Sequence, residues 1–251
     1  MKNWLESSVF TDVNNPKEFC KGIQHVVNQI NGAGVFLGDN LFTYGKNLSF
    51  LDDEKFMEAF TRHAKTNIEQ SIIWRFSILT WAALRAMQLE GDFIECACYK
   101  GTSARIVCDY VDFMNCDKKY YLYDSFEHND SMIHHGMPEL GTGLYETVCH
   151  RFSDVSNVVV TQGLVPQILH EVSPEKIAFM HIDLNNAPAE VGALELLFDR
   201  MTSGAVLVLD DYGWLSYRAQ KIAEDEFFGR RGYIAIIYRL WNFSTHPSEK
   251  F

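Results

Sequence analysis

The sequence predicts a doubly wound α/β fold with a mostly parallel sheet, preceded by a helical lead-in at the N-terminus. Three observations indicate this fold. Short apolar runs recur after Gly91, helical stretches separate these runs, and residues 51–91 show no strand alternation. Nearly continuous apolar strands that alternate with helices are typical of a parallel sheet covered on both faces.

The N-terminal segment, residues 1–90, is expected to be mainly helical. Apolar residues recur at helical spacing over 72–87, and Gly91 is a natural end for that helix. Residues 31–49 are rich in Gly and Asn and predict a loop. We therefore expect a domain boundary between residues 90 and 91.

The remainder, residues 91–251, is expected to form the sheet domain. Strands are expected at 92–97, 119–124, 157–163, 176–183, 204–211 and 233–241, with helices at 101–114, 142–152, 164–171, 188–201 and 216–232. Only the short polar stretch NFSTHPSEKF follows the last strand. This leaves open whether the sheet ends in a complete closing hairpin.

Composition narrows the possible classes of protein. A formal charge of −11 over 251 residues argues against a general nucleic-acid binder and against binding to an anionic membrane surface. Six cysteines without the spacing of a disulfide framework, and no apolar stretch long enough for a signal peptide or a membrane span, favour a reducing, cytoplasmic setting. The helix around Trp74 and Trp81 is expected to pack on the sheet or on another subunit, so a homo-oligomer remains open.

Polar residues gather where the expected strands end. In a doubly wound sheet the ligand binds beyond the carboxyl ends of the strands, at the point where the strand order reverses. These ends carry Glu95 to Ala97, Asp124, Gln162 with Gly163, Asp183 to Asn185, and Asp210 with Asp211. Their convergence on one edge predicts a functional site there.

The first two ends indicate what kind of ligand is bound. The stretch ECACYKGTS contains only Gly101, which argues against a nicotinamide dinucleotide, because the backbone of such a site needs several glycines. Glu95 would repel phosphate and attract an amino group, unless it only caps or pairs with a helix. Asp124 is placed to accept hydrogen bonds from ribose hydroxyls, although aspartate is common wherever a strand enters a loop.

The aspartates of the next two ends suggest a cation. The ends of neighbouring strands lie about 4.8 Å apart, so the carboxylates of Asp183, Asp210 and Asp211 would crowd one another. Such crowding either raises the pKa of one of these carboxyl groups or recruits a hard dication such as Mg²⁺. The alternative is that one aspartate caps a helix and another pairs with Arg218 or Lys221.

Histidine and cysteine give weaker signals. His181 shares a strand face with Asp183 and is either a general base or a core histidine. Cys96 and Cys98, even together with Cys108 and Cys116, do not have common zinc spacing, and these residues are expected to be buried, inert thiols.

Several of these stretches together resemble one enzyme family. GDFIECACYKGTSA, YLYDSFE, VVVTQGLVPQIL, IAFMHID and ALELLFDRMTSGAVLVLDDYG are similar to successive motifs of the macrocin O-methyltransferase family. The resemblance covers residues 91–232. It implies a class I, Rossmann-like methyltransferase that uses S-adenosylmethionine and Mg²⁺ to methylate a small polyhydroxylated acceptor, such as a sugar or a glycosylated metabolite.

The resemblance also implies roles for particular residues. Catalytic residues would be Asp183, Asn185 and His181, and the metal ligands would be Asp183, Asp210 and Asp211. The cofactor would be bound by Glu95, Ala97, Tyr99, Gly101, Thr102, Ser103, Asp124, Ser125, Phe126, Gln162, Gly163 and Asp183.

The chain departs from the family pattern at two positions. The family usually reads H-I-D-x-D and uses the second aspartate as a base, whereas this chain has Asn185, which cannot accept a proton at neutral pH. The acceptor proton could still be removed in three ways: the metal alone acidifies the acceptor, His181 acts as the base, or the acceptor is acidic enough already. Alternatively, the chain binds the cofactor and has lost or changed the chemistry of methyl transfer. The other departure is Ala97, where the family has glycine.

Overall fold

The computed structural model describes residues 3–5, 13–32, 34–130, 132, 136–234, 236–238 and 241–245. The chain forms two compact units, Met1–Ile78 and Leu79–Phe251, and the division falls within helix α4 (Ile73–Ala86). Among the described residues, no helix combines the length and apolar character needed to cross a bilayer.

The first unit combines helices with a small three-stranded sheet. Its strands are in the order β1-β2-β3, with β1 and β2 parallel and β2 and β3 antiparallel. Its elements are β1 (Trp4–Leu5), α1 (Pro16–Val27), β2 (Val35–Gly38), β3 (Leu41–Tyr44), α2 (Glu54–His63), α3 (Asn67–Ser71) and the start of α4.

Strands β2 and β3 contradict the loop expected over residues 31–49. They are joined by a two-residue turn, Asp39 and Asn40, in which both residues have φ of 54°. Two positive φ values are the mark of the tight turn that joins antiparallel strands, and Asn and Asp tolerate them well. Arg75 holds the turn with two hydrogen bonds of 2.8 and 2.6 Å to the Asp39 carboxylate. The polar residues were therefore the signature of a hairpin.

The two tryptophans of α4 differ in their surroundings. Trp74 packs in the first unit against the rings of Phe36 and Phe50, at centroid distances of 4.9 and 5.3 Å. Trp81 is 49% exposed in this single chain.

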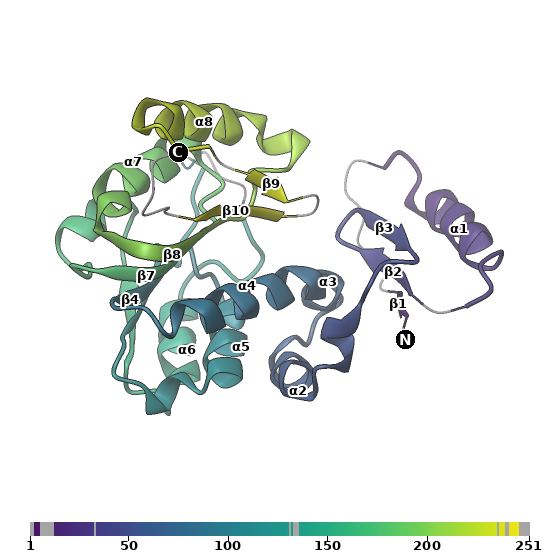
Figure 1. Cartoon of the computed structure of the whole chain (residues 1–251), viewed down its shortest axis with the longest axis horizontal. Coiled ribbons are helices and arrows are strands. Elements are labelled where there is room, and N and C mark those ends of the chain that lie inside the picture. Colours follow the sequence, from purple (N-terminus) through teal and green to yellow (C-terminus); the bar gives the residue numbers. More distant parts are fainter. Residues whose placement is uncertain are drawn as a thin grey trace. The chain divides into compact units, whose positions relative to one another are not determined.

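The second unit is the expected doubly wound α/β domain (Figure 1). Five parallel strands form its centre: β4 (Asp92–Cys96), β5 (Tyr120–Asp124), β6 (Val158–Gln162), β7 (Ile177–Ile182) and β8 (Met201–Leu209). Its helices are α5 (Thr102–Val111), α6 (Leu144–Arg151), α7 (Ala187–Leu197) and α8 (Arg218–Arg231), and the expected helix at 164–171 is reduced to a 3-10 turn at Gln167–His170.

The sheet closes with an antiparallel hairpin that the sequence did not establish. Its strand order is β6-β5-β4-β7-β8-β10-β9, with β9 at Ile236–Tyr238 and β10 at Trp241–Thr245. β10 pairs antiparallel with both β8 and β9. The single strand expected at 233–241 is therefore wrong, because the continuous apolar run concealed the point where the chain reverses.

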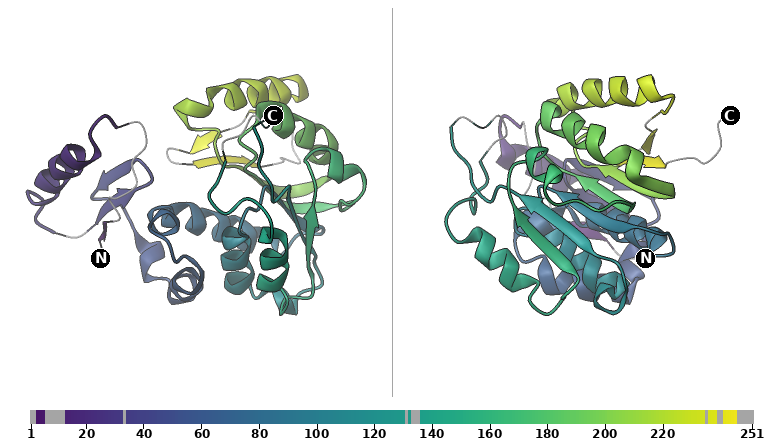
Figure 2. Two further views of the ribbon diagram at one scale, coloured as in Figure 1. Left: turned by 180° about the vertical axis from the view of Figure 1, so that it is seen from behind. Right: turned by 90° about the vertical axis from the view of Figure 1, so that its left-hand side faces the viewer.

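Each face of the sheet is covered by its own helices (Figures 1 and 2). Helices α7 and α8 cover one face, over a buried core that includes Met180, Ile182, Leu207, Leu209, Leu194 and Phe228. Helix α5 lies on the other face, where the rings of Phe93, Phe113, Tyr120 and Phe179 pack together. The strand order reverses between β4 and β7, so a ligand site is expected at the carboxyl ends of these strands.

Candidate active site

Strand register brings together acidic groups that are far apart in the sequence. Glu95 on β4 pairs with His181 on β7, and His181 pairs with Val208 on β8. Residues at one level of neighbouring parallel strands project to the same face. Asp183 and Asp210 each follow two residues later, so they extend the same face to the edge of the sheet.

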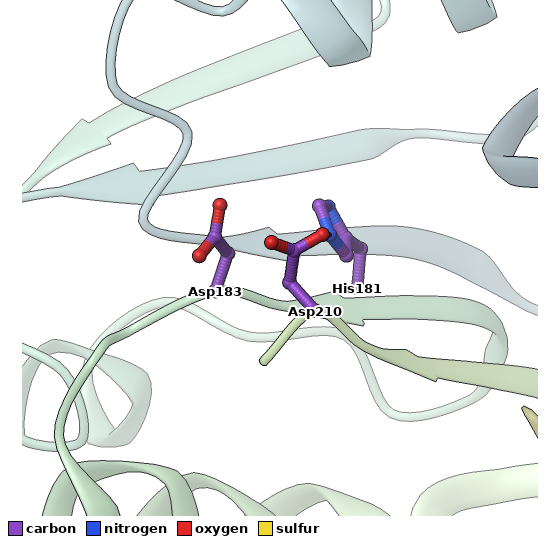
Figure 3. Close-up of side chains that lie close together, drawn as sticks. All are labelled: His181, Asp183 and Asp210. Carbon is purple, nitrogen blue, oxygen red and sulfur yellow. The ribbon is translucent and has the colours of Figure 1, made fainter. Parts of the chain in front are cut away.

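His181, Asp183 and Asp210 form a cluster at this edge (Figure 3). One potential ligand atom from each residue lies within 4.8 Å of the others. His181 is also close to Glu95: its Nδ1 is 3.4 Å from Glu95 Oε1, while its Nε2 is 3.7 Å from Asp210 Oδ1. The imidazole therefore lies between the two buried carboxylates.

The position of His181 determines its charge. Burial alone would lower the pKa of this imidazole, but the carboxylates of Asp210 and Glu95 outweigh burial and raise the pKa to about 10. This raised pKa favours the protonated, positively charged imidazole at neutral pH when no metal is bound. A protonated imidazole can neither ligate a metal nor accept a proton, so this state does not fit the expected role of general base.

Asp211 is not part of the cluster found among the described residues. Strand alternation places it with Leu207 and Leu209, on the face covered by α7 and α8. Its charge contributes to raising the pKa of Glu224 on α8. The group that the structure brings together therefore differs from the expected ligand set, because it has His181 and lacks Asp211.

Neither Arg218 nor Lys221 accounts for the aspartates of the cluster in the described contacts. Lys221 pairs instead with Asp225 on its own helix, and its Nζ lies 4.8 Å from the centre of the Tyr212 ring. No contact between Arg218 and an aspartate is found in the described part of the chain.

The two amides after Asp183 have different roles. Asn185 has a φ of 52°, and its Nδ2 donates a hydrogen bond of 3.4 Å to Asp183 Oδ1. Asn186 is the N-cap of α7, and its Oδ1 accepts a 3.1 Å hydrogen bond from the backbone of Ala189. One amide thus orients a carboxylate of the cluster, and the other caps a helix.

Glu95 lies in the interior, with 2% of its surface exposed. Its Oε2 accepts a 2.8 Å hydrogen bond from the Tyr120 hydroxyl, and its Oε1 accepts one from the Ser103 hydroxyl in the first turn of α5. This bond to the start of a helix matches the structural alternative for Glu95. Its role toward a cofactor stays a prediction.

The loop after β4 has the tight geometry of a ligand-binding turn. Ala97 and Tyr99 have φ of 66° and 49°, in the left-handed region that favours glycine. Gly101 caps α5 with φ of 69°, and a Cβ there would lie 2.7 Å from the Phe152 ring. Gly101 is therefore required by packing, and Ala97 keeps a conformation that suits the glycine of the family.

Asp124 joins this loop to the one after β5. Its Oδ2 accepts a 2.7 Å hydrogen bond from the backbone of Tyr99, and its Oδ1 accepts a 2.7 Å bond from the backbone of Phe126. The Phe126 ring is buried against Tyr145, at a centroid distance of 5.4 Å. Any contact of Phe126 with a ligand would therefore involve its backbone.

The remaining candidate residues lie around the same edge. Gln162 at the end of β6 is exposed, and its Nε2 donates a 3.1 Å hydrogen bond to the backbone of Ser125. The backbone of Gly163 donates to the carbonyl of Asp124 at 2.8 Å. Thr102 is buried, and its hydroxyl accepts a 3.2 Å bond from Arg151.

Three of the four thiols expected to be buried are so, whereas Cys116 is only partly buried. Cys96, Cys98 and Cys108 are at most 3% exposed, and burial is the main cause that raises the pKa of each. A raised pKa keeps a thiol protonated and unreactive.

Sequence reasoning missed two buried polar residues near the site, Tyr120 and Glu190. Tyr120 bonds Glu95, and Glu190 bonds the backbone of Leu184, next to Asp183. Glu190 carried a signal, since it is an acidic residue within the apolar helical run APAEVGALELL.

Comparisons with known proteins agree with this architecture. A family model described as "Methyltransferase domain" matches residues 94–212. A sequence search of curated proteins found no match.

Solved structures of low sequence identity share the fold. The O-methyltransferase NovP is 16% identical with a TM-score of 0.59, over 72% of this chain and 82% of NovP. CalS11, a TDP-rhamnose 3'-O-methyltransferase of calicheamicin biosynthesis, is 12% identical with a TM-score of 0.56, over 94% of this chain and 96% of CalS11. The SAH-bound methyltransferase PaMTH1 of Podospora anserina is 10% identical with a TM-score of 0.50, over 94% and 99% of the two chains. The chain therefore has a class I Rossmann-like fold, and its residues 94–212 match the model of a methyltransferase domain.

Proposed function

We propose that this protein is an S-adenosylmethionine-dependent, Mg²⁺-assisted O-methyltransferase that acts on a small polyhydroxylated acceptor, such as a sugar or a glycosylated metabolite. The observation that carries the proposal is the pair of carboxylates, Asp183 and Asp210, beside the loop after β4 at the switch point of the sheet. The O-methyltransferase NovP shares the fold and supports the reaction class, and the TDP-rhamnose 3'-O-methyltransferase CalS11 supports a sugar as the acceptor.

The donor atoms of the cluster suit a hard dication. Asp183 and Asp210 offer carboxylate oxygens, which Mg²⁺ prefers, at the accessible end of the strands. Asp183 is partly exposed, which leaves room for the waters and acceptor oxygens that complete a magnesium shell. When bound, the ion would lower the pKa of the acceptor hydroxyl that it ligates.

The cofactor would lie over the loops that follow β4 and β5. The Asp124 carboxylate accepts backbone hydrogen bonds from Tyr99 and Phe126 at the end of β5, the place where an acidic residue binds ribose hydroxyls in doubly wound folds. The set proposed to bind S-adenosylmethionine is Glu95, Ala97, Tyr99, Gly101, Thr102, Ser103, Asp124, Ser125, Phe126, Gln162, Gly163 and Asp183. The resemblance to SAH-bound PaMTH1 supports the choice of cofactor.

The residues around the cation would mainly orient and stabilise charge. Asn185 donates to Asp183 and cannot remove a proton, and the raised pKa of His181 favours its protonated form. Acceptor deprotonation would therefore depend on the acidity of the hydroxyl. Positioning the acceptor oxygen in line with the transferred methyl group would supply much of the remaining rate.

Calorimetric titration tests the cofactor. S-adenosylmethionine and S-adenosylhomocysteine are titrated into the protein with Mg²⁺ and with a chelator. Micromolar binding of either is expected, and its absence under both conditions would refute the cofactor assignment. A radiolabelled methyl donor with a panel of nucleotide sugars and glycosylated metabolites then tests the reaction class.

Aspartate variants test the cation. Asp210→Asn is expected to weaken Mg²⁺ binding at least about tenfold, because it removes a charged ligand. Asp211→Asn is expected to cause a smaller loss, since strand alternation places Asp211 on the opposite face. Asp225→Asn, which alters a carboxylate bonded to Tyr212 and Lys221, is the control. Equal metal affinity of wild type and Asp210→Asn would refute the proposed ion site.

A further inference from the structure

Three polar side chains are buried between the sheet and the helices α7 and α8. Glu190 on α7 and Gln220 and Glu224 on α8 are 2%, 3% and 1% exposed. They lie on the same side of the sheet as the apolar core formed with these helices. Burial of polar groups is costly unless they bond one another, so their placement requires a specific arrangement.

The contacts of Glu190 reach from this layer to the active-site turn. Its Oε1 accepts a 2.8 Å hydrogen bond from Gln220 Nε2 and a 3.3 Å bond from the backbone N–H of Leu184. Leu184 lies between Asp183, a ligand in the proposed function, and Asn185, whose backbone has a positive φ.

The charge of Glu224 on α8 also acts on Glu190. Burial first, and then Glu224, raise the pKa of Glu190 to about 9, which favours the protonated carboxyl at neutral pH. In this form its Oε1 still accepts from Leu184 and Gln220.

We propose that Glu190 is a positioning residue which, with Gln220, fixes the turn at residues 183–186 and thereby the direction of the Asp183 carboxylate. The role of Asp183 as a cation ligand rests on the proposed function. The two hydrogen bonds that Glu190 accepts from Leu184 and Gln220, called the brace below, do not depend on that role.

Two substitutions separate positioning from general stability. Glu190→Gln keeps an oxygen that can accept from Leu184 and Gln220 and removes only the titratable proton. Glu190→Ala removes the acceptor. Glu195→Ala is the control on the same helix, because Glu195 faces solvent and pairs with Arg230 and Arg231.

Hydrogen exchange of the Leu184 amide, followed by NMR, is the first readout, and Mn²⁺ affinity is the second. Glu190→Ala is expected to speed exchange at least about tenfold and to weaken Mn²⁺ binding about tenfold, the usual effect of removing an outer-shell partner. Glu190→Gln and Glu195→Ala should stay within about twofold of the wild type in both. Unchanged Leu184 exchange in Glu190→Ala, or an equal loss in Glu190→Gln, would overturn the proposal.

A second variant and the Leu184 exchange rate cover two cases in which the first comparison would give no answer. If Glu190→Ala does not fold, Gln220→Ala removes one of the two donors to Glu190 Oε1 and should speed Leu184 exchange about threefold; unchanged exchange would again overturn the proposal. If the wild type binds no Mn²⁺, the proposed cation site fails, while Leu184 exchange still decides whether the brace exists.

Discussion

Restoring the carboxylate of the family pattern by Asn185→Asp should make the fold depend on a cation. The amide of Asn185 donates a hydrogen bond to Asp183 Oδ1 at 3.4 Å. The substitution replaces this donor by an acceptor of the same size and adds a second negative charge beside the first. Without metal the turn would lose an attraction and gain a repulsion.

The distance in the structure sets the magnitude. Two unit charges 3.4 Å apart repel by about 5 kcal/mol at an effective dielectric constant of about 20, and by about 1 kcal/mol in bulk water. Because both side chains are partly exposed, we expect the free energy of unfolding to fall by about 1–3 kcal/mol without metal. A bound dication removes the repulsion, so Mg²⁺ affinity should rise about 10- to 100-fold.

Urea unfolding with a chelator and with saturating Mg²⁺ measures both effects. Asn186→Asp is the matched control: it makes the same chemical change one residue later, at an N-cap where aspartate is equally suitable. It should leave stability and Mg²⁺ affinity nearly unchanged. Equal stability of Asn185→Asp and the wild type without metal, together with unchanged Mg²⁺ affinity, would refute the contact between Asn185 and Asp183. Methyl transfer gained by Asn185→Asp would further show that a base is missing.

Three other predictions follow from single residues. Ala97→Gly should raise the free energy of unfolding by about 1 kcal/mol, because glycine adopts the left-handed conformation of this residue without strain. As a control, Ala104→Gly within α5 should lower the free energy of unfolding by a similar amount. If urea unfolding shows no gain for Ala97→Gly, the backbone at Ala97 is not strained. Tyr120→Phe should destabilise the protein by about 1–3 kcal/mol, because it removes a donor to the buried Glu95 carboxylate, and thermal unfolding checks this. Burial raises the pKa of Glu190 from its ordinary 4.5 to about 9 in the folded protein. The contribution of Glu190 to stability is therefore complete below pH 4.5 and is lost as the pH rises through about 9. In Glu190→Gln, the free energy of unfolding should decline less between these two pH values.

Local pattern was sufficient to predict the architecture of the second unit. The apolar strands β4 to β8 and the helices between them follow from composition and periodicity, because a strand buried on both faces must be apolar throughout. The same pattern placed Asp124, Asp183 and Asp210 at strand ends, and parallel strands bring their carboxyl ends to one edge. The family resemblance then supplied the expectation of methyl transfer, which the match to a methyltransferase domain supports.

Chain reversals were less visible in the sequence. Asp39 and Asn40 suggest both a loop and a tight turn, and only the pairing of β2 with β3 distinguishes the two. The hairpin of β9 and β10 spans the end of the apolar run YIAIIYRLW and the start of the polar stretch after it, and this run contains no glycine or proline to mark a turn.

Only the tertiary structure determined which polar groups meet at the site. Asp210 and Asp211 are neighbours in the chain, but strand alternation sends them to opposite faces, one beside His181 and the other toward Glu224. The pairing of Glu95 with His181 depends on the register of β4 against β7, and the bond from Leu184 to Glu190 depends on how α7 returns over the sheet. Sequence determines which residues reach the strand ends, whereas register and helix packing decide which of their side chains come into contact.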